Sequence, residues 1–233
     1  MKKQTLNRIL ILWLLTLMVC QNAVFSADRS IQYFVSQREQ WKKLIGVSQT
    51  LEGRISTFSS KSLRFRNCPI PFYFVGDIPK LDTSFKNVEV TGALARENGR
   101  VVFNVKLLKK MPTDIEHFVT EESKIDRARP RDWYSLADWA KQRADFYEDE
   151  ELTQKALSAY KSGIDADYRQ LLVKQPESLL KLADRAQQYE LDPLLYDALR
   201  HEALVLEWQS LLKQKDPDQG PLLNQILKYF PTA

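Results

Sequence analysis

The side chains that most often carry catalysis or bind metals are sparse in this chain and form no known constellation. It has two histidines, His117 and His201. His201-Glu202 begins like the helix of a zinc protease, but Val205 stands where the second histidine ligand is required. The sequence contains no Gly-x-Ser-x-Gly turn for a nucleophilic serine, and no glycine-rich loop that could hold a phosphate. We therefore expect no enzyme activity, no metal and no cofactor.

Three acidic runs could attract cations: residues 148–151 (EDEE), 165–167 (DAD) and 216–220 (DPDQG). The first stands at the expected start of a helix, where carboxylates interact favourably with the helix dipole. A divalent cation there is the alternative. The other two begin like calcium loops but lack the third oxygen ligand and the distal glutamate. We interpret both as turns.

The residues with the clearest binding chemistry are basic. We expect the side chains of the early arginines to share the outward side of adjacent strands, with two later cations extending that surface: Arg54, Arg64 and Arg66, then Arg100 and Lys106. A guanidinium can hold phosphate, sulfate or carboxylate through two parallel hydrogen bonds. The structural alternative is a solvated strand face, or a dock for an acidic part of the chain.

Aromatic residues weigh against a nucleic-acid ligand. Proteins that bind single strands usually stack exposed aromatics on the bases. In this chain the aromatics near the basic residues fall mostly on the inward phase of their strands: Phe58, Phe65, Phe72, Phe74 and Phe103. An acidic polysaccharide is therefore the expected ligand of such a face, if it has one.

The first 26 residues carry the pattern of a secretory signal. Lys2, Lys3 and Arg8 precede an apolar core at residues 9–20 (ILILWLLTLMVC), and residues 24–26 (VFS) offer small residues for cleavage before Ala27. The core is short for a membrane span, although an uncleaved anchor is the alternative. We expect a secreted or periplasmic protein without a transmembrane segment after cleavage.

Cleavage would leave Cys68 as the single cysteine, since the other, Cys20, belongs to the signal. A lone cysteine cannot form an internal disulfide, so the chain is not a disulfide-stapled scaffold. The apolar setting of Cys68 predicts a buried, inert thiol rather than a reactive one.

Charge divides unevenly along the chain. Residues 27–120 hold 15 Lys and Arg against 9 Asp and Glu, a net +6, whereas residues 121–233 hold 16 against 21, a net −5. The simpler interpretation is that the two halves attract each other, and the alternative is that the first half meets an anion.

The strongest structural signal is a hairpin at residues 85–109 (FKNVEVTGALARENGRVVFNVKLLK). Apolar residues alternate with polar ones on both sides of Asn98-Gly99, the dipeptide typical of a type I′ turn. Gly92 interrupts the first strand and predicts a bulge or tight bend. In the second strand, Phe103, Val105 and Leu107 are expected on one face.

Further short strands precede this hairpin, at about residues 51–58, 63–66 and 72–75, which makes about five strands in a stretch that suits a small closed barrel. The segments VEVTG (88–92), NGR (98–100) and FNV (103–105) resemble the strand–hairpin pattern of an OB-fold. That resemblance covers about residues 47–110 and implies a face that binds oligonucleotides, oligosaccharides or proteins, without catalytic residues.

The regions around the barrel differ in pattern. Ile31, Phe34, Trp41 and Leu44 recur at helical spacing, and polar residues that include Arg38 and Lys42 lie between them. This pattern predicts an amphipathic helix at residues 27–46 that packs on the next module. A helix on a membrane surface is the alternative. The barrel is expected at residues 47–118, a polar linker at residues 119–131 and a helical domain at residues 132–233.

The helical domain shows apolar stripes and few glycines, and we expect helices to begin at Pro176 and at Asp192-Pro193, a cap followed by a first-turn proline. Gly163 is expected to close one helix. LADWAKQ (136–142) recurs as LADRAQQ (182–188), and each copy is followed by an Ala-Leu pair, at 156–157 and 198–199. This unit resembles the tetratricopeptide-like helical repeats of exported bacterial proteins, although the later positions of that motif do not match. A plain helical bundle is the alternative.

Together these patterns predict an α+β protein: a signal peptide, an OB-like five-stranded barrel and an all-α domain of antiparallel helix pairs. We expect a non-catalytic interaction or scaffold protein with a protein partner. A binding module for an anionic polymer, such as an acidic polysaccharide, is the alternative.

Overall fold

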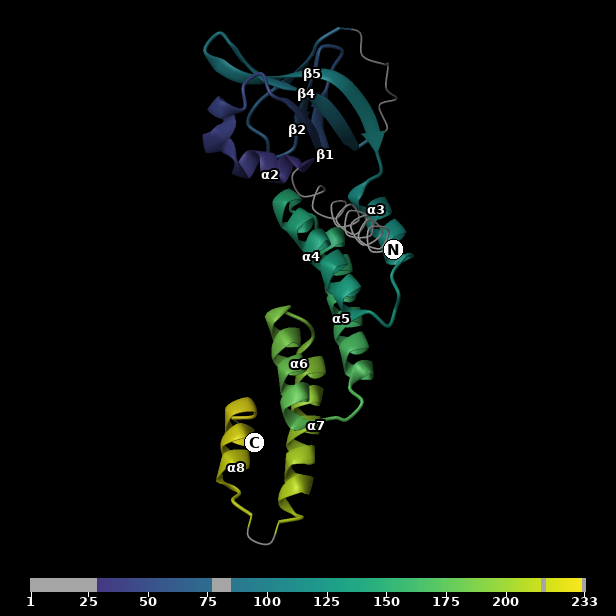
Figure 1. Ribbon diagram of the computed structural model, residues 1–233, viewed down its shortest axis with the longest axis vertical. Helices are drawn as coiled ribbons and strands as arrows, with labels where there is room; N and C mark the ends of the chain where they lie inside the picture. Colours follow the sequence, from purple (N-terminus) through teal and green to yellow (C-terminus); the bar gives the residue numbers. More distant parts are fainter. Residues whose placement is uncertain (1–28, 77–84, 215–216, 232–233) are drawn as a thin grey trace, which may run out of the picture. The chain divides into compact units, whose positions relative to one another are not determined.

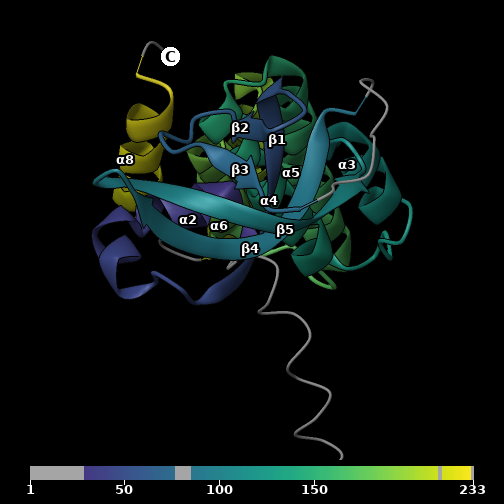
Figure 2. The same cartoon turned by 90° about the horizontal axis from the view of Figure 1, so that it is seen from above.

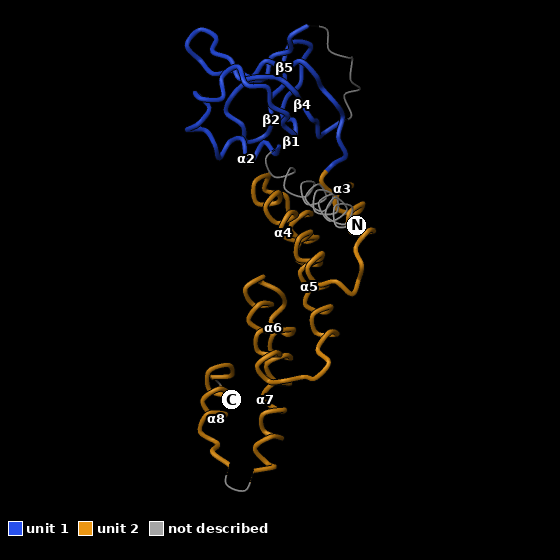
Figure 3. Tube along the Cα trace, viewed as in Figure 1, with its two compact units in different colours: residues 1–113 blue, residues 114–233 orange. Residues whose placement is uncertain are grey.

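The computed structural model describes residues 29–76, 85–214 and 217–231, so the predicted signal at residues 1–26 lies outside the described part. The chain divides into two compact units, one ending at Thr113 and the other beginning at Asp114 (Figures 1 and 3). Helix α3 (Asp114–Glu122) opens the second unit. It occupies residues that the sequence pattern gave to the end of the barrel and to a linker. The helix is short, and its buried residues are only Asp114 and Phe118. The sequence of this segment therefore shows little of the apolar spacing that predicts a helix.

The first unit is a closed five-stranded barrel. Its strands are β1 (Ser48–Phe58), β2 (Ser62–Phe65), β3 (Phe72–Phe74), β4 (Asn87–Glu97) and β5 (Arg100–Met111). They close in the order β1-β2-β3-β5-β4, with β3 and β5 parallel and the other pairs antiparallel (Figure 2). This arrangement confirms an OB-like barrel.

The β4–β5 hairpin turns at Asn98-Gly99 as predicted. Both residues have positive φ, 49° and 79°, as a type I′ turn requires. Glu97 and Arg100 pair directly across this two-residue loop. The side chains of Val88, Val90 and Leu94 are buried inside the barrel.

A bulge in β5 changes which residues face inward. Thr91 pairs with Leu107, whereas Gly92 pairs with Val105, so Lys106 is the extra residue. Beyond it the alternation shifts by one residue. Leu107, which strict alternation placed on the inward face with Val105, is therefore 66% exposed. A Cβ on Gly92 would lie 2.0 Å from the carbonyl oxygen of Asn104, so only glycine fits opposite the bulge.

The amphipathic segment before the barrel is not one continuous helix. It forms α2 (Ile31–Ser36), capped by the side chain of Ser30, and a 3₁₀ helix, η2 (Arg38–Lys43). The predicted apolar stripe nevertheless packs on the barrel, because Ile31, Phe34 and Trp41 are buried. The ring of Phe34 stacks on that of Trp41 at 4.7 Å and meets Phe103 edge-on at 6.3 Å.

The second unit continues with helices α4 (Pro130–Tyr147), α5 (Glu150–Gln170), α6 (Pro176–Gln188), α7 (Pro193–Leu211) and α8 (Gly220–Tyr229). Figure 1 shows α4 beside α5 and α6 beside α7. The predicted helix starts are confirmed. Prolines stand in the first turns of α6 and α7, Asp192 caps α7, and Asp149, from the first acidic run, caps α5.

Two predictions in this unit are wrong. Gly163 does not close a helix but lies in the middle of α5, and residues 165–167 lie in the same helix rather than in a turn. Glycine is required there for packing: an added Cβ would lie 2.5 Å from the ring of Tyr134 on α4. Close contact between the two helices thus outweighs the low helix propensity of glycine.

The two copies of the LADxAxQ segment, on α4 and α6, bury corresponding positions. Leu136, Ala137 and Ala140 of α4 are buried, as are their counterparts Leu182, Ala183 and Ala186 of α6. The two Ala-Leu pairs lie in different phases, because Ala156 is buried whereas Ala198 is exposed. Within the described residues, no helix has the length and apolar character needed to cross a membrane.

Candidate anion-binding groove

An open groove of about 790 Å³ lies on the barrel unit. Three segments that are distant in sequence form its walls: the 3₁₀ helix η2, the β2–β3 region and the tip of the β4–β5 hairpin. This is the region that OB-folds use for ligands, the face of strands 2 and 3 with the loop between strands 4 and 5. The residues that line it are Arg38, Trp41, Lys42, Arg64, Pro69, Ile70, Pro71, Tyr73, Glu97, Asn98, Arg100, Val101 and Val102. We call it the basic groove.

Four cationic side chains give the basic groove its charge. Arg38 and Lys42 come from η2, Arg64 points outward between the inward Leu63 and Phe65 of β2, and Arg100 follows the hairpin turn. None of the four makes an ion pair with another residue in the described part of the chain. Their combined field is therefore available to an anion from outside.

Tyr73 is an aromatic residue that sequence reasoning missed. Phe65, Phe72 and Phe103 are fully buried, as predicted, but Tyr73 is 40% exposed and lines the basic groove. The signal was present in the alternation of Phe72-Tyr73-Phe74, whose middle residue must face the opposite side from its neighbours. Phe58, predicted mostly inward, is 37% exposed at the end of β1.

The structure brings together two of the five predicted basic residues, Arg64 and Arg100. Arg54 lies on β1, and Arg66 directly follows β2. The Arg66 amide donates to the carbonyl oxygen of Arg54 at 2.8 Å, and neither residue lines the groove. Lys106 is the bulge residue of β5 and is also outside it. Arg38 and Lys42 complete the groove. The sequence pattern predicted them only as part of the polar face of an amphipathic helix.

Cys68 follows β2 and is buried, as predicted. Burial raises the pKa of its thiol to about 11, and this effect exceeds the opposing influence of a backbone hydrogen bond and of Arg64. The thiol is therefore neutral at physiological pH and a poor nucleophile.

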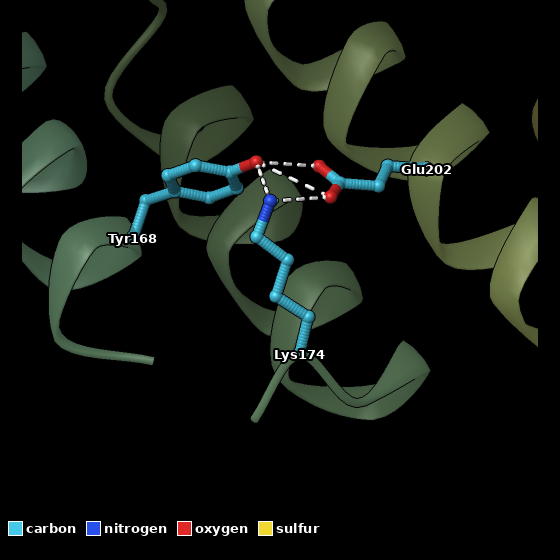
Figure 4. A network of polar contacts seen from close by, with 3 residues as sticks. All are labelled: Tyr168, Lys174 and Glu202. Atoms are coloured by element: carbon cyan, nitrogen blue, oxygen red, sulfur yellow. Dashed lines mark hydrogen bonds and ion pairs between the residues drawn. The ribbon is translucent and has the colours of Figure 1, made fainter. Parts of the chain in front are cut away.

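The second unit holds polar clusters that connect its helices. Figure 4 shows the side chains of Tyr168 on α5, Lys174 in the following loop and Glu202 on α7 in mutual contact. Lys174 Nζ lies 2.7 Å from Glu202 Oε1, and the Tyr168 hydroxyl donates to Glu202 Oε2 at 2.9 Å. Hydrogen bonding to Glu202 and Tyr168 raises the pKa of Lys174. Burial alone would raise the pKa of Glu202, but its hydrogen bonds from Lys174 and Tyr168 hold it below the ordinary value.

A second cluster joins α4, α5 and α6. The Tyr134 hydroxyl donates to Asp167 Oδ2 at 2.7 Å, and Arg185 donates to the same oxygen at 2.5 Å. Burial, followed by the hydrogen bond to Asp167, raises the pKa of Tyr134. The ring of Tyr160 stacks on that of Tyr189 at 3.9 Å. These contacts connect α4, α5 and α6.

The histidines do not form a site. His117 lies against Trp139, with ring centroids 4.6 Å apart, and His201 is exposed on α7. In the part of the chain that is described, no three His, Cys, Asp or Glu side chains are grouped so that they could hold a metal ion. Comparison with protein-family models, with curated proteins and with solved structures finds no match to the chain.

Proposed function

We propose that this chain is a non-catalytic, exported binding protein whose barrel holds an anionic polymer in the basic groove. One observation carries the proposal: Arg38, Lys42, Arg64 and Arg100, from three distant segments, converge on one open groove without ion-pair partners in the described part of the chain. Guanidinium groups in such a setting bind carboxylate or sulfate through two hydrogen bonds each.

An acidic polysaccharide fits the groove better than a nucleic acid does. Tyr73 is the one substantially exposed aromatic among the lining residues, whereas single-strand binders present several. Glu97 pairs with Arg100 across the hairpin turn and can accept hydrogen bonds from the hydroxyls of a polysaccharide. The signal pattern at residues 1–26 also favours an extracellular or periplasmic ligand.

The test is a fluorescence titration of the purified protein with a labelled polygalacturonate oligosaccharide and a labelled single-stranded oligonucleotide. Two charge-reversed variants are compared. The groove variant carries Arg64→Glu and Arg100→Glu, and the matched control carries Arg66→Glu and Lys106→Glu. All four side chains are exposed on the barrel and the net charge change is the same. We expect the groove variant to lose at least about 100-fold in affinity for the oligosaccharide, since each charge-assisted contact contributes roughly 1.5–3 kcal/mol.

The control variant should lose less than about fivefold, because its charges act on the ligand only through screened long-range attraction. Equal losses in both variants would show that net charge alone attracts the polymer, and the groove would not be the site. Tighter binding of the oligonucleotide than of the oligosaccharide would show that the ligand is a nucleic acid rather than an acidic polysaccharide.

A second candidate function is suggested by exposed apolar side chains on the last two helices. On α7 the exposed residues are Val205 and Trp208, and Leu212, the residue that caps its end, continues the helical spacing. On α8 they are Leu223 and Leu227, and the exposed fractions of all five lie between 38% and 64%. Apolar stripes of this kind dock the apolar face of a partner helix. In this role the second unit is a scaffold of tetratricopeptide-like helix pairs that binds a protein. Loss of a co-purifying protein on Trp208→Glu, with retention on Leu172→Glu at an exposed loop position, would support it.

A further inference from the structure

The barrel unit carries a second hollow, of about 450 Å³, that the basic groove does not include. It uses the other side of the α2–η2 segment. The basic groove takes Arg38, Trp41 and Lys42 from this segment, whereas the second hollow takes Tyr33, Phe34, Gln37, Gln40 and Leu44. Arg29 and the β1 residues Gln49, Thr50 and Leu51 complete its lining. We call it the glutamine hollow.

The polar groups of the glutamine hollow are amides and hydroxyls rather than charges. Three of its lining residues are glutamines, the set contains no carboxylate, and Arg29 is its single charged residue. An amide offers both donors and acceptors, and so does a sugar hydroxyl. An anion would be held by Arg29 alone, in contrast to the four cations of the basic groove.

Two of the glutamines are arranged in advance. Gln40 Nε2 donates to Gln37 Oε1 at 2.8 Å. This bond links the two side chains and leaves the Gln37 amide nitrogen and the Gln40 amide oxygen outside it, so that each can bond a ligand. If both amides are assigned in the reverse orientation, one amide nitrogen and one amide oxygen still remain, exchanged between the two residues. Neighbouring hydroxyls of a sugar ring, one accepting and one donating, match this pair.

The rest of the lining suits the apolar C–H face of a pyranose ring. Phe34 and Leu51 are 3% and 2% exposed and form an apolar floor, and Tyr33 is 42% exposed beside them. Small-ligand sites combine an apolar surface with a few convergent polar groups in this way. The volume of the hollow is within the range of such sites.

We propose that the glutamine hollow binds a neutral, hydroxyl-rich sugar unit, with Gln37 and Gln40 bonding neighbouring hydroxyls and Tyr33 contacting the ring face. This site does not depend on the charge of the basic groove. Binding to the glutamine hollow is therefore measured with neutral probes. High salt is used because it screens the attraction of charged molecules to the basic groove.

The experiment follows the side-chain amide signals of ¹⁵N-labelled protein by NMR in 0.5 M NaCl. Maltohexaose, cellohexaose and chitohexaose are titrated separately to 20 mM. We expect saturable shifts of the Gln37 and Gln40 amide signals with at least one of the three probes. The Gln37→Leu, Gln40→Leu double variant, read through the backbone amides of Thr50 and Leu51, should weaken that binding at least tenfold.

Controls separate this site from the rest of the surface. Gln142→Leu with Gln188→Leu, two exposed glutamines of the second unit, should leave the affinity unchanged. The Arg64→Glu, Arg100→Glu variant should also bind the neutral probe normally, even though it loses the acidic one. Tyr33→Ala removes a ring that is 42% exposed and provides a further variant should the double glutamine change impair folding. Absence of saturable shifts with all three probes, or equal binding by the wild type and by both hollow variants, overturns the proposal.

Discussion

At the scale of single residues, the charged and the aromatic contributions to binding in the basic groove come from different side chains and can be measured separately. Lys42 contributes a charge, whereas Tyr73 contributes an aromatic surface that is 40% exposed. We expect Lys42→Ala to weaken polygalacturonate binding and to lower the slope of log affinity against log salt by about one. Tyr73→Ala should weaken binding about fivefold to tenfold while leaving that slope unchanged, because contact between an aromatic ring and a sugar ring releases no counterions.

Titrations between 50 and 400 mM NaCl measure both effects. Leu107→Ala is the control, since it truncates an exposed apolar side chain on the barrel outside the groove. An unchanged slope in Lys42→Ala would mean that this lysine does not touch the ligand.

A substitution at Gly163 tests whether the close contact between α4 and α5 requires glycine. Gly163→Ala places a methyl group 2.5 Å from the ring of Tyr134, and the hydrogen bond from Tyr134 to Asp167 prevents the ring from moving away. We expect a loss of about 1–2 kcal/mol in unfolding free energy, because overpacking outweighs the gain in helix propensity. Urea unfolding measures it. In a Tyr134→Leu background the same change should be neutral or stabilising, and an equal loss in both backgrounds would contradict the packing argument.

At the scale of elements, a buried ion pair anchors α3. Arg143 Nε of α4 donates to Asp114 Oδ1 of α3 at 2.7 Å, and the two side chains are 10% and 3% exposed. Asp114→Ala would leave the guanidinium buried without this partner, and such losses cost about 3–5 kcal/mol. Circular dichroism during urea unfolding measures the change. Lys141→Ala, which breaks the exposed pair with Asp145, should cost less than about 0.5 kcal/mol.

We expect the link between α5 and α7 to depend on pH. Glu202 has a lowered pKa, so its contribution to stability is present above the ordinary carboxyl value of 4.5 and is lost as the pH falls through the folded-state value. The raised pKa of Lys174 has the opposite sign, and its contribution disappears only as the pH rises above 10.5. Glu202→Gln should therefore lower Tm at pH 7 but not at pH 3. An equal decrease at both pH values would show that the carboxylate charge is not responsible.

Sequence patterns predicted the elements where local rules decide them. Asn98-Gly99 determines its turn by backbone conformation, and Asp192-Pro193 determines the start of α7 by capping. Predictions failed where contacts with residues distant in the sequence determine the local structure. Leu107 faces outward because of a bulge opposite Gly92, and α5 continues through Gly163 because Tyr134 packs on it. The basic groove could be foreseen only in part for the same reason: Arg64 follows from strand alternation, whereas Arg38 and Lys42 join it through tertiary packing of η2.

At the scale of the whole molecule, the boundary at Thr113 sharpens the charge asymmetry. Residues 27–113 hold 15 Lys and Arg against 7 Asp and Glu, a net +8, whereas residues 114–233 hold 16 against 23, a net −7. The second unit also has a hydrophobic core formed by its own residues, from Phe118 to Ala203. We therefore expect residues 114–233 alone to give a helical circular dichroism spectrum and a cooperative thermal transition. A non-cooperative melt would show that this unit needs the barrel.

The same asymmetry predicts how the second unit affects binding. A polyanion that approaches the basic groove in the whole protein also experiences the field of the acidic unit. Residues 29–113 alone should therefore bind polygalacturonate about threefold to tenfold more tightly than the whole protein at 20 mM salt. The difference should vanish at 500 mM, where screening limits charge effects to a few ångströms. Once circular dichroism has established that the excised barrel is folded, weaker binding by it at both salt concentrations would require the second unit to supply contacts to the polymer.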